Sequence, residues 1–238
     1  MYLILRERGN IMEILTKKQL EELREFDTPT VSNAIERFNI RPWTEGFMNS
    51  EIKCILADGK PMVGYASTAK ISAINPPTEE QKEMSMKYYK SVKDAPNPTI
   101  AVIQDIDSIP IGSFWGEVNV SQHKALGCVG TITNGGVRDL DQVQDIGFSF
   151  FASCVLVSHA YVHLENYNYA VVVGGLTVKP GDLLHADKHG VCLIPGEIAA
   201  EVAEACRKVQ RAEKPVISGC RKHFEKGDVS LDDLKKWR

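Results

Sequence analysis

Hydrophobic residues recur at helical spacing near the start of the chain. Thr16-Lys17-Lys18-Gln19 fits a capping box, and Leu20, Leu23 and Phe26 follow three residues apart. A second start signal, Asp27-Thr28-Pro29, opens a segment whose apolar residues again share one face. The pattern therefore predicts two short amphipathic helices, one directly after the other.

The middle of the chain alternates between apolar runs and amphipathic segments. Residues 62–74 and 99–107 are typical of strands, with a polar, helical stretch around 78–92 between them. The alternation continues with a helix over 115–127 closed by Gly127, a strand over 128–133, a helix over 138–147 and a strand over 148–155. Short connections in this βαβαβ order predict an α/β arrangement with parallel strands.

The pattern changes after residue 160. Short β-runs punctuated by Gly and Pro turns fill 169–195 and predict a β-meander or the closing part of a barrel. An amphipathic helix follows Pro195, and its expected inward residues are Ile198, Val202, Cys206 and Val209. The polar tail 214–238 is expected to form a surface helix or an arm toward a neighbouring subunit. Because no linker or repeat interrupts the chain, we expect one domain over 1–238 with its core at about 20–210.

Composition narrows the class of protein. The 238 residues include 43% hydrophobic and 25% charged residues, and the formal net charge is −3. These values fit a globular protein and exclude a strongly basic nucleic-acid binder. The six cysteines form no CxxC pair, so reduced thiols and a cytoplasmic setting are expected. No apolar run approaches the roughly 20 residues of a membrane span, and the apolar stretch in the opening MYLILRERGN is shorter than a signal peptide is expected to need. Neither a nucleic acid nor a membrane is expected as a partner.

Two loops of the central region carry candidate chemistry. If strands 99–107 and 128–133 are parallel neighbours, the loops before Glu117 and Asp139 open at the same edge of the sheet, where α/β proteins bind ligands. Both loops also lead into helix N-termini, whose free N–H groups attract anions. Glu117, Arg138 and Asp139 are therefore expected to converge on one crevice.

The residue types in this crevice suit a metal-assisted reaction of a small oxo acid. Carboxylate oxygens are typical ligands of Mg²⁺ or Mn²⁺, and an arginine fork matches a carboxylate. Gly135 and Gly136 allow a substrate to approach the backbone. A structural interpretation stays open: Asp139 caps a helix, Arg138 is solvated, and Asn134-Gly135-Gly136 is only a turn.

The stretch WGEVNVSQHKALGCVGTITNGGVRDLDQV, residues 115–143, is similar to the signature of the family shared by 4-hydroxy-4-methyl-2-oxoglutarate aldolases and the regulator of ribonuclease activity A. Aldolase members carry an acidic residue, twenty intervening residues and then Arg-Asp, which Glu117 and Arg138-Asp139 match. Residues 27–38 resemble the family's N-terminal helix, and residues 173–195 resemble its closing β-segment. The resemblance covers roughly residues 20–210.

The resemblance implies a fold and an assembly. The fold is a compact α/β domain of the αββα type with a central β-sandwich or barrel, similar to the swivelling β/β/α folds. Members assemble as homotrimers or homohexamers with sites at subunit interfaces. This expectation qualifies the simple parallel sheet that the alternation alone predicts.

The resemblance also implies an activity. Aldolase members are class II enzymes that use Mg²⁺ or Mn²⁺ to cleave 4-hydroxy-2-oxo diacids to pyruvate, and they decarboxylate oxaloacetate. By resemblance, Asp139 binds the metal, Glu117 holds a metal-bound water, and Arg138 contacts the substrate near its reacting carbonyl. Gly116 and the amides of Val118 and Asn119 bind the substrate. The metal stabilises the pyruvate enolate as a Lewis acid. We hypothesise that the water oriented by Glu117 is the base for the C4 hydroxyl.

The alternative aldolase chemistry uses a lysine Schiff base. No lysine falls in the two loops, and Lys124 lies on the helix body, where it is expected to be solvated. The metal-dependent route is therefore expected.

Several residues depart from the family's usual pattern. Glu117 stands where some relatives have Asp. His159 and His163 have the i, i+4 spacing of a metal pair, but no third ligand is evident, so no zinc site is expected. His185 and His189 flank a turn and are expected to be surface residues, with Asp187 as a turn former.

Two other functions compete with the aldolase. One is a non-catalytic regulator that binds a ribonuclease or another protein, although dedicated regulators lack the full acidic and Arg-Asp set. The other is a menaquinone methyltransferase, a label given to some relatives. The chain shows no glycine-rich cofactor loop of the dinucleotide-binding kind, which argues against it.

Overall fold

A computed structural model describes residues 3–5, 11–57 and 59–237. Its helices are α1 (Lys17–Leu23), α2 (Thr28–Glu36), α3 (Glu79–Asp94), α4 (Glu117–Ala125), α5 (Leu140–Ile146), α6 (Ala199–Arg221) and α7 (Leu231–Trp237). Its strands are β1 (Leu3–Leu5), β2 (Ile11–Glu13), β3 (Lys53–Leu56), β4 (Met62–Ser72), β5 (Thr99–Asp105), β6 (Ser113–Trp115), β7 (Cys128–Val137), β8 (Ser149–Val155), β9 (His163–Tyr167), β10 (Val171–Val173), β11 (Leu176–Val178), β12 (Leu183–Asp187) and β13 (Gly190–Ile194). Much of the opening segment, on which the expectation about a signal peptide rests, lies outside the described residues.

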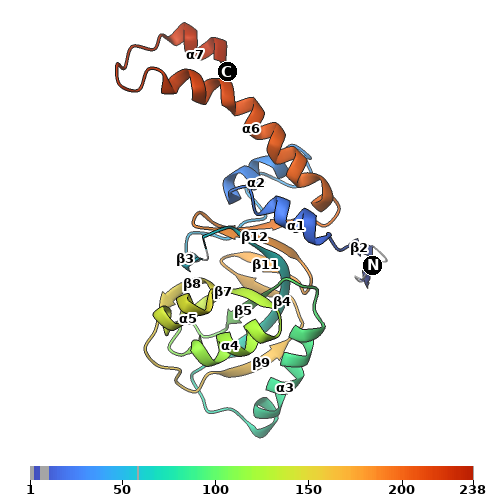
Figure 1. The fold of residues 1–238 in the computed structure, drawn as a ribbon. Helices are drawn as coiled ribbons and strands as arrows, with labels where there is room; N and C mark the ends of the chain where they lie inside the picture. The colour runs from blue at the N-terminus through green and yellow to red at the C-terminus, as the bar shows by residue number, and fades with distance from the viewer. Residues whose placement is uncertain (1–2, 6–10, 58, 238) are drawn as a thin grey trace.

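A mixed sheet forms the centre of the molecule (Figure 1). Strands β4, β5, β7 and β8 lie side by side and parallel, as the alternation predicted. Antiparallel strands flank this block: β12 and β13 extend it beyond β4, and β3 extends it beyond β8. The result is an α/β fold around a nearly closed, barrel-like sheet. The parallel block was predicted from the alternation, and the antiparallel β12–β13 hairpin falls in the segment 169–195, which was expected to form a β-meander or the closing part of a barrel.

Helices cover the sheet in two groups (Figure 1). Helices α1, α2 and α6 pack against β12 and β13 through a cluster that includes Leu23, Val31 and Ile194. The four residues predicted to face inward from the last helix are all buried. Helices α3, α4 and α5 pack on other strands through a second cluster that includes Tyr88 and Trp115. Helix α4, between β6 and β7, is therefore held by the second cluster.

The helix starts agree with the sequence signals. Thr16 and Gln19 form the predicted capping box of α1, and Asp27 caps α2 with Pro29 in its first turn. Gly127 follows the last residues of α4 with a φ of +100°, so it ends the helix as predicted. The starts of α1 and α2 and the end of α4 are thus fixed by residues next to them in the chain.

Strand β7 is longer than predicted. The sequence predicted a strand over 128–133 and left a turn at Asn134-Gly135-Gly136, but the strand runs to Val137. Pairing with β5 ends at Thr133, but Gly136 and Val137 pair with β6 on one side and with the end of β8 on the other, so the strand continues. The Asn134 side chain joins this extension to β5, because its amide accepts the N–H of Asp105 and donates to the Asp105 carbonyl, both at 2.8 Å.

His185 was wrongly expected at the surface. Its side chain is fully buried, with Nδ1 3.0 Å from the Thr28 hydroxyl and Nε2 3.1 Å from the Leu23 carbonyl oxygen. Burial lowers the pKa of this imidazole. The histidine joins β12 to the end of α1 and the start of α2, a packing role that the local sequence did not signal.

The chain ends in a helical arm. Helix α6 packs on α1 and α2 through its first half, and its second half projects from the body before α7 folds back on it (Figure 1). No described helix combines the length and apolarity needed to cross a membrane.

Candidate active site

Strands β6 and β7 bring the two predicted loops together. Trp115 pairs with Val137 in the parallel β6–β7 ladder, and the backbone N–H of Arg138 donates to the Trp115 carbonyl at 2.9 Å. The chain after Trp115 leads into α4, and the chain after Val137 leads into α5. The two loops therefore open at one edge of the sheet, as the spacing predicted.

The Asp139 carboxylate reaches across this edge. Its Oδ2 accepts a hydrogen bond from the backbone N–H of Glu117 at 2.9 Å. Asp139 itself has a φ of +57°, and its side chain makes no capping bond to α5, which follows it. Asp139 therefore caps a helix, as the structural interpretation expected, but the capped helix is α4 and not α5, which begins directly after Asp139. The left-handed backbone turns the carboxylate toward the other loop.

Gly116 makes room for this approach. A Cβ built at Gly116 would lie 2.5 Å from Oδ2 of Asp139 and 3.1 Å from Nε of Arg138. Its φ of −154° is extended backbone that any residue adopts, so the close approach of these two side chains, and not the backbone conformation, favours glycine here. The absence of a side chain at Gly116 lets the Asp139 carboxylate reach the α4 N-terminus.

Arg138 lies beside the same carboxylate. Its Nε is 3.8 Å from Oδ2 of Asp139, and its Nη1 donates to the Val157 carbonyl at 3.4 Å. Both charged side chains are about one-third exposed, so the guanidinium remains open to a ligand. Val157, which follows β8, is 95% exposed and belongs to the rim of the site.

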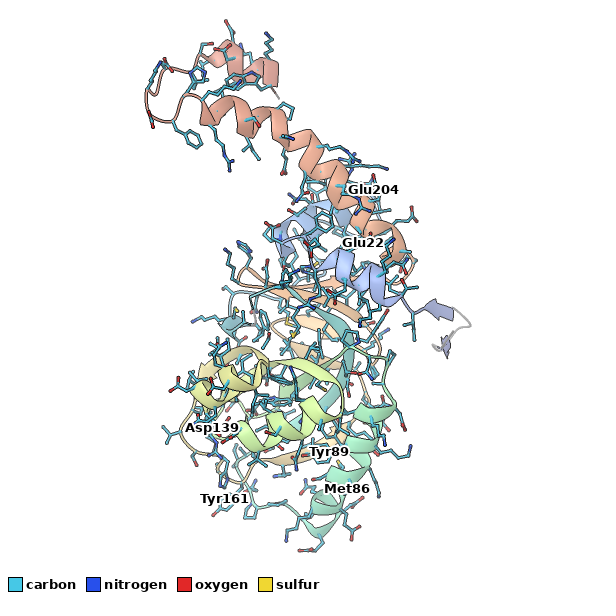
Figure 2. The ribbon with its side chains drawn as sticks, in the orientation of Figure 1. Glu22, Met86, Tyr89, Asp139, Tyr161 and Glu204 are labelled. Carbon is cyan, nitrogen blue, oxygen red and sulfur yellow. The ribbon has the colours of Figure 1, made fainter. Side chains whose placement is uncertain are left out.

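The α4 N-terminus supplies further polar groups. Glu117 is exposed in the first turn, and Val118 after it is exposed as well. Amides of a first helical turn have no partner within the helix. The Asn119 side chain points inward instead: its Nδ2 donates to the Phe114 carbonyl, and its Oδ1 lies 3.1 Å from the Tyr89 hydroxyl. Asn119 thus holds the helix start in place. In Figure 2, Asp139 lies in the part of the body opposite the C-terminal arm.

Gly135 and Gly136 lie in β7 and are buried. A Cβ at Gly136 would lie 2.4 Å from Cδ1 of Leu156, and one at Gly135 would lie 3.1 Å from Oδ2 of Asp105. Packing inside the sheet therefore accounts for both glycines.

An aromatic cluster behind α4 was not singled out in the sequence. His123 is fully buried, with its ring centroid 4.5 Å from that of Trp115. Its Nε2 lies 2.8 Å from the Tyr88 hydroxyl, and its Nδ1 lies 2.7 Å from the Asn119 carbonyl oxygen. Burial lowers the pKa of His123 to about 4, so the ring is neutral at pH 7. The i, i+4 spacing of His123 from Asn119 on a helix was the sequence signal that could have indicated their contact.

Oxygen ligands at this edge fit a hard divalent cation. Oδ2 of Asp139 accepts the Glu117 N–H and lies beside Arg138, whereas among residues 11–57 and 59–237 Oδ1 accepts no hydrogen bond. The same described residues contain no group of three or more His, Cys, Asp or Glu side chains that could enclose a metal ion. A cation at Asp139 would therefore be held by few protein oxygens and by waters, which is the usual habit of Mg²⁺.

The remaining histidines are not brought to this site as a pair. His159 lies in the loop after β8, whereas His163 begins β9 and pairs with Glu165 at 3.0 Å. The two residues are not on a helix, so their i, i+4 spacing does not place both rings on one helical face. His189 is exposed and bonds Asp187, which forms the predicted turn and also accepts the Thr28 N–H at 2.9 Å.

A cavity of about 500 Å³ lies elsewhere, at the amino ends of the parallel strands. Its lining includes Leu15, Met62, Pro98 and Val129. The cavity is thus at the edge of the sheet opposite the converging charges, and it is separate from the site described above.

Comparisons with known proteins agree with this architecture. The family model described as RraA-like, Aldolase/RraA, matches residues 28–193. A Halalkalibacterium halodurans protein provisionally named 4-hydroxy-4-methyl-2-oxoglutarate aldolase is 26% identical over 192 residues, which are 80% of this chain and 83% of that protein. Protein DlpA of Legionella pneumophila is 23% identical over 212 residues, and the match covers 88% of this chain but only 33% of DlpA.

A solved structure shares the fold. It belongs to Streptomyces coelicolor RraAS2, described as an unusual member of the RNase ES inhibitor RraA protein family. The TM-score is 0.67 at 20% identity, and the match covers 85% of this chain and 96% of that chain.

Proposed function

The chain belongs to the RraA-like family, Aldolase/RraA, and from this premise we propose that it is a divalent-metal-dependent lyase acting on small 2-oxo acids. The expected reactions are aldol cleavage of 4-hydroxy-2-oxo diacids of the 4-hydroxy-4-methyl-2-oxoglutarate type and decarboxylation of oxaloacetate, both yielding pyruvate. The observation that carries the proposal is the convergence of Arg138, Asp139 and the α4 N-terminus, joined by the Asp139–Glu117 hydrogen bond.

The proposed substrate site has two anion-binding parts. The amides of Val118 and Asn119, in the first turn of α4, bind the carboxylate of the 2-oxo acid, aided by the helix dipole. Gly116 leaves the approach to this turn open. Arg138 donates hydrogen bonds near the reacting carbonyl and stabilises the negative charge that develops there when the C–C bond breaks.

Asp139 and Glu117 have separate proposed roles, in metal binding and in proton transfer. Asp139 is the proposed direct ligand of Mg²⁺ or Mn²⁺, through the oxygen not used by Glu117, and the bound ion supplies Lewis-acid polarisation of the 2-oxo group. The exposed Glu117 carboxylate orients a water that accepts the proton of the C4 hydroxyl during aldol cleavage. Decarboxylation loses CO₂ and requires no such base, so it depends less on Glu117.

Assembly of several copies belongs to the same proposal. Exposed apolar side chains lie before β6, in the first turn of α4 and at the end of β8, namely Ile109, Ile111, Val118, Val155 and Val157. Apolar surface of this kind supports contact with a second copy in a homotrimer or homohexamer. We also propose that the chain works in the cytoplasm as one domain.

The test is pyruvate release from oxaloacetate and from 4-hydroxy-4-methyl-2-oxoglutarate by purified protein with Mg²⁺ or Mn²⁺. The proposal predicts release above the free-metal background that disappears on chelation. If pyruvate release from both substrates equals the release by the free metal alone, the proposal is wrong.

The rival function is a non-catalytic regulator that binds a ribonuclease or another protein. It predicts partner binding that is indifferent to Asp139→Asn. The aldolase predicts metal-dependent turnover that this substitution abolishes, so one variant separates the two functions.

A further inference from the structure

The cavity of about 500 Å³ at the amino ends of the parallel strands lies apart from the proposed reaction. It is lined by the region of α1, the start of β4, the segment before β5, and the chain where α4 and α5 end. Helix α4 reaches both places: Glu117 at its start belongs to the candidate active site, and Lys124 near its end lines the cavity. The cavity is therefore a second site, to which the proposed lyase activity assigns no task.

The walls of the cavity are largely apolar. Its apolar lining consists of Leu15, Leu20, Met62, Val63, Pro98 and Val129. Cavities that hold small organic ligands usually measure about 300–1,000 Å³ and are lined mainly by such side chains. A small oxo diacid would lose its hydration against these walls without gaining partners for both carboxylates. The lining therefore favours a ligand whose body is apolar.

A buried hydroxyl in the lining has no partner. Ser149 is only 4% exposed, and its hydroxyl makes no hydrogen bond with any other residue that the structure describes. Gly130 leaves room for this part of the wall, because a Cβ there would overlap Sδ of Met62 and lie 3.0 Å from Cβ of Ser149. A buried hydroxyl without a partner costs stability unless a bound molecule accepts its hydrogen bond. Ser149 thus provides a donor for a polar group of the ligand.

Basic residues prevail among the charged groups of the lining. These groups are Lys17, Arg24, Lys60 and Lys124, with Glu21 as the acidic residue. Four bases against one acid give a formal charge of +3, in a chain whose net charge is −3. Glu21 is bound by Arg24 at 3.2 Å, and Lys60 is bound to Glu25, next to the lining, at 2.8 Å. The charge of the cavity therefore favours an anionic ligand over a cationic one.

Two ammonium groups remain available to bind that anion. Lys124 donates to the Gly147 carbonyl at 2.7 Å, which fixes its position and uses one of its three N–H donors. Gly147 precedes β8 and Ser149 begins it, so the ammonium and the unpartnered hydroxyl line the same side of the cavity. Lys17 is exposed at the start of α1 and makes no hydrogen bond or ion pair through its side chain with another described residue. Two donors thus lie together on one side, with a further positive charge at the start of α1.

We propose that this cavity binds a fatty-acid-like monocarboxylate. Its carboxylate accepts hydrogen bonds from the Lys124 ammonium and the Ser149 hydroxyl, and its apolar chain lies against Leu20, Met62 and Val63. A carboxylate fits this pair of donors because each of its two oxygens accepts hydrogen bonds. Binding here involves neither the proposed metal nor Asp139, so it does not rest on the proposed lyase activity.

Displacement of a fluorescent anion from the full-length protein tests the ligand class. The probe is anilinonaphthalene sulfonate, an apolar ring system with one negative charge, and the competitor is dodecanoate. We expect saturable fluorescence of the bound probe and its displacement by dodecanoate. Dodecyltrimethylammonium, which has the same chain length and a positive charge, should bind at least 10-fold more weakly. Absence of dodecanoate binding, or equal competition by the two compounds, overturns the proposal.

Charge reversal tests the position of the site. Lys124→Glu should weaken dodecanoate binding at least 10-fold, and Lys17→Glu should weaken it at least threefold. The matched control is Lys87→Glu, because Lys87 is exposed on α3 and does not line the cavity. The control should bind dodecanoate within twofold of wild type. If Lys124→Glu does not fold, Lys17→Glu still tests the site, since the Lys17 ammonium makes no polar contact with another described residue. Equal affinities of the cavity and control variants contradict the proposal.

Two neutral substitutions complete the test. Ser149→Ala removes the hydroxyl without breaking a hydrogen bond to another described residue, and it should weaken dodecanoate binding at least threefold. Asp139→Asn should keep wild-type affinity for dodecanoate, whether or not it loses pyruvate release. Wild-type affinity in Ser149→Ala, or a fall in affinity with Asp139→Asn, contradicts the proposed site. The readout is ligand binding, so a failure here is distinguishable from a failure of the proposed lyase activity.

Discussion

The Asp139 carboxylate accepts a hydrogen bond from the backbone N–H of Glu117, a residue 22 positions earlier in the chain, at 2.9 Å. This bond joins the end of β7 to the start of α4. It gives Asp139 a structural task beside the proposed metal-binding one. Substitutions must therefore separate loss of the hydrogen bond from loss of the charge.

Asp139→Ala and Asp139→Asn make this separation. Alanine removes the acceptor of the Glu117 N–H and should lower the free energy of unfolding by about 1 kcal/mol, the usual value of an N-terminal cap. Asparagine keeps an acceptor oxygen and should unfold within about 0.5 kcal/mol of wild type. Urea unfolding measures both values. Equal destabilisation by the two substitutions would show that the charge, and not the hydrogen bond, holds α4.

Gly116→Ala should damage the site through contact alone. The added methyl would lie 2.5 Å from Oδ2 of Asp139. We expect a loss of about 1–3 kcal/mol in stability and a matching fall in pyruvate release. The cost should shrink in an Asp139→Ala background, because the carboxylate no longer meets the methyl. If the stability losses of Gly116→Ala and Asp139→Ala are fully additive in the double variant, the added methyl does not clash with the Asp139 carboxylate.

Arg138→Lys tests the guanidinium as a substrate group. Lysine keeps the positive charge but loses the planar fork that fits a carboxylate or carbonyl. We expect kcat/KM to fall at least 100-fold while the melting temperature changes little, since Arg138 is partly exposed and its bond to Val157 is long. Steady-state kinetics on oxaloacetate give the first value and thermal unfolding the second. Wild-type kcat/KM in this variant would remove Arg138 from the substrate site.

Acid should destabilise the fold through His123. Its folded pKa of about 4 lies below the ordinary value of 6.5, because burial disfavours the charged imidazole. The unfolded chain therefore binds the proton more readily, and stability from the neutral ring is present above pH 6.5 and lost as the pH falls toward 4. The slope should approach about 1.4 kcal/mol per pH unit within this window.

Asp105 opposes this trend. Burial raises its pKa to about 6, and the carboxyl is therefore protonated in the fold at pH values where the unfolded chain has lost the proton. Its stabilising contribution is present below pH 3.8 and is lost as the pH rises through 6. His123→Gln should flatten the acid loss, and Asp105→Asn should steepen it, in unfolding measured from pH 4 to 7. Parallel curves for both variants and wild type would contradict these assignments.

Local signals predicted the helices and the parallel block because capping residues and apolar periodicity act within a few positions. Thr16, Asp27 and Gly127 each mark a helix boundary through contacts with near neighbours. The convergence of the two loops also followed from the parallel order of β5 and β7. These features need no knowledge of distant contacts.

Features decided by distant contacts were not predicted. The extension of β7 depends on pairing with β6 and with the end of β8, and the Asn134 amide joins it to the Asp105 backbone, 29 residues away. The burial of His185 depends on helices more than 150 residues earlier. The orientation of Asp139 depends on a left-handed backbone conformation, which the sequence did not indicate because the residue is not a glycine. In each case a polar side chain found its partner in the tertiary fold.

The central claim is that Asp139 carries a divalent cation for the cleavage of 2-oxo acids. Its most direct test compares wild type with Asp139→Asn in Mn²⁺-dependent pyruvate release from oxaloacetate and from 4-hydroxy-4-methyl-2-oxoglutarate. We expect metal-dependent release by wild type and a loss of at least 100-fold in the variant, with the fold intact. Wild-type release at the free-metal background, or undiminished release by Asp139→Asn, would contradict it.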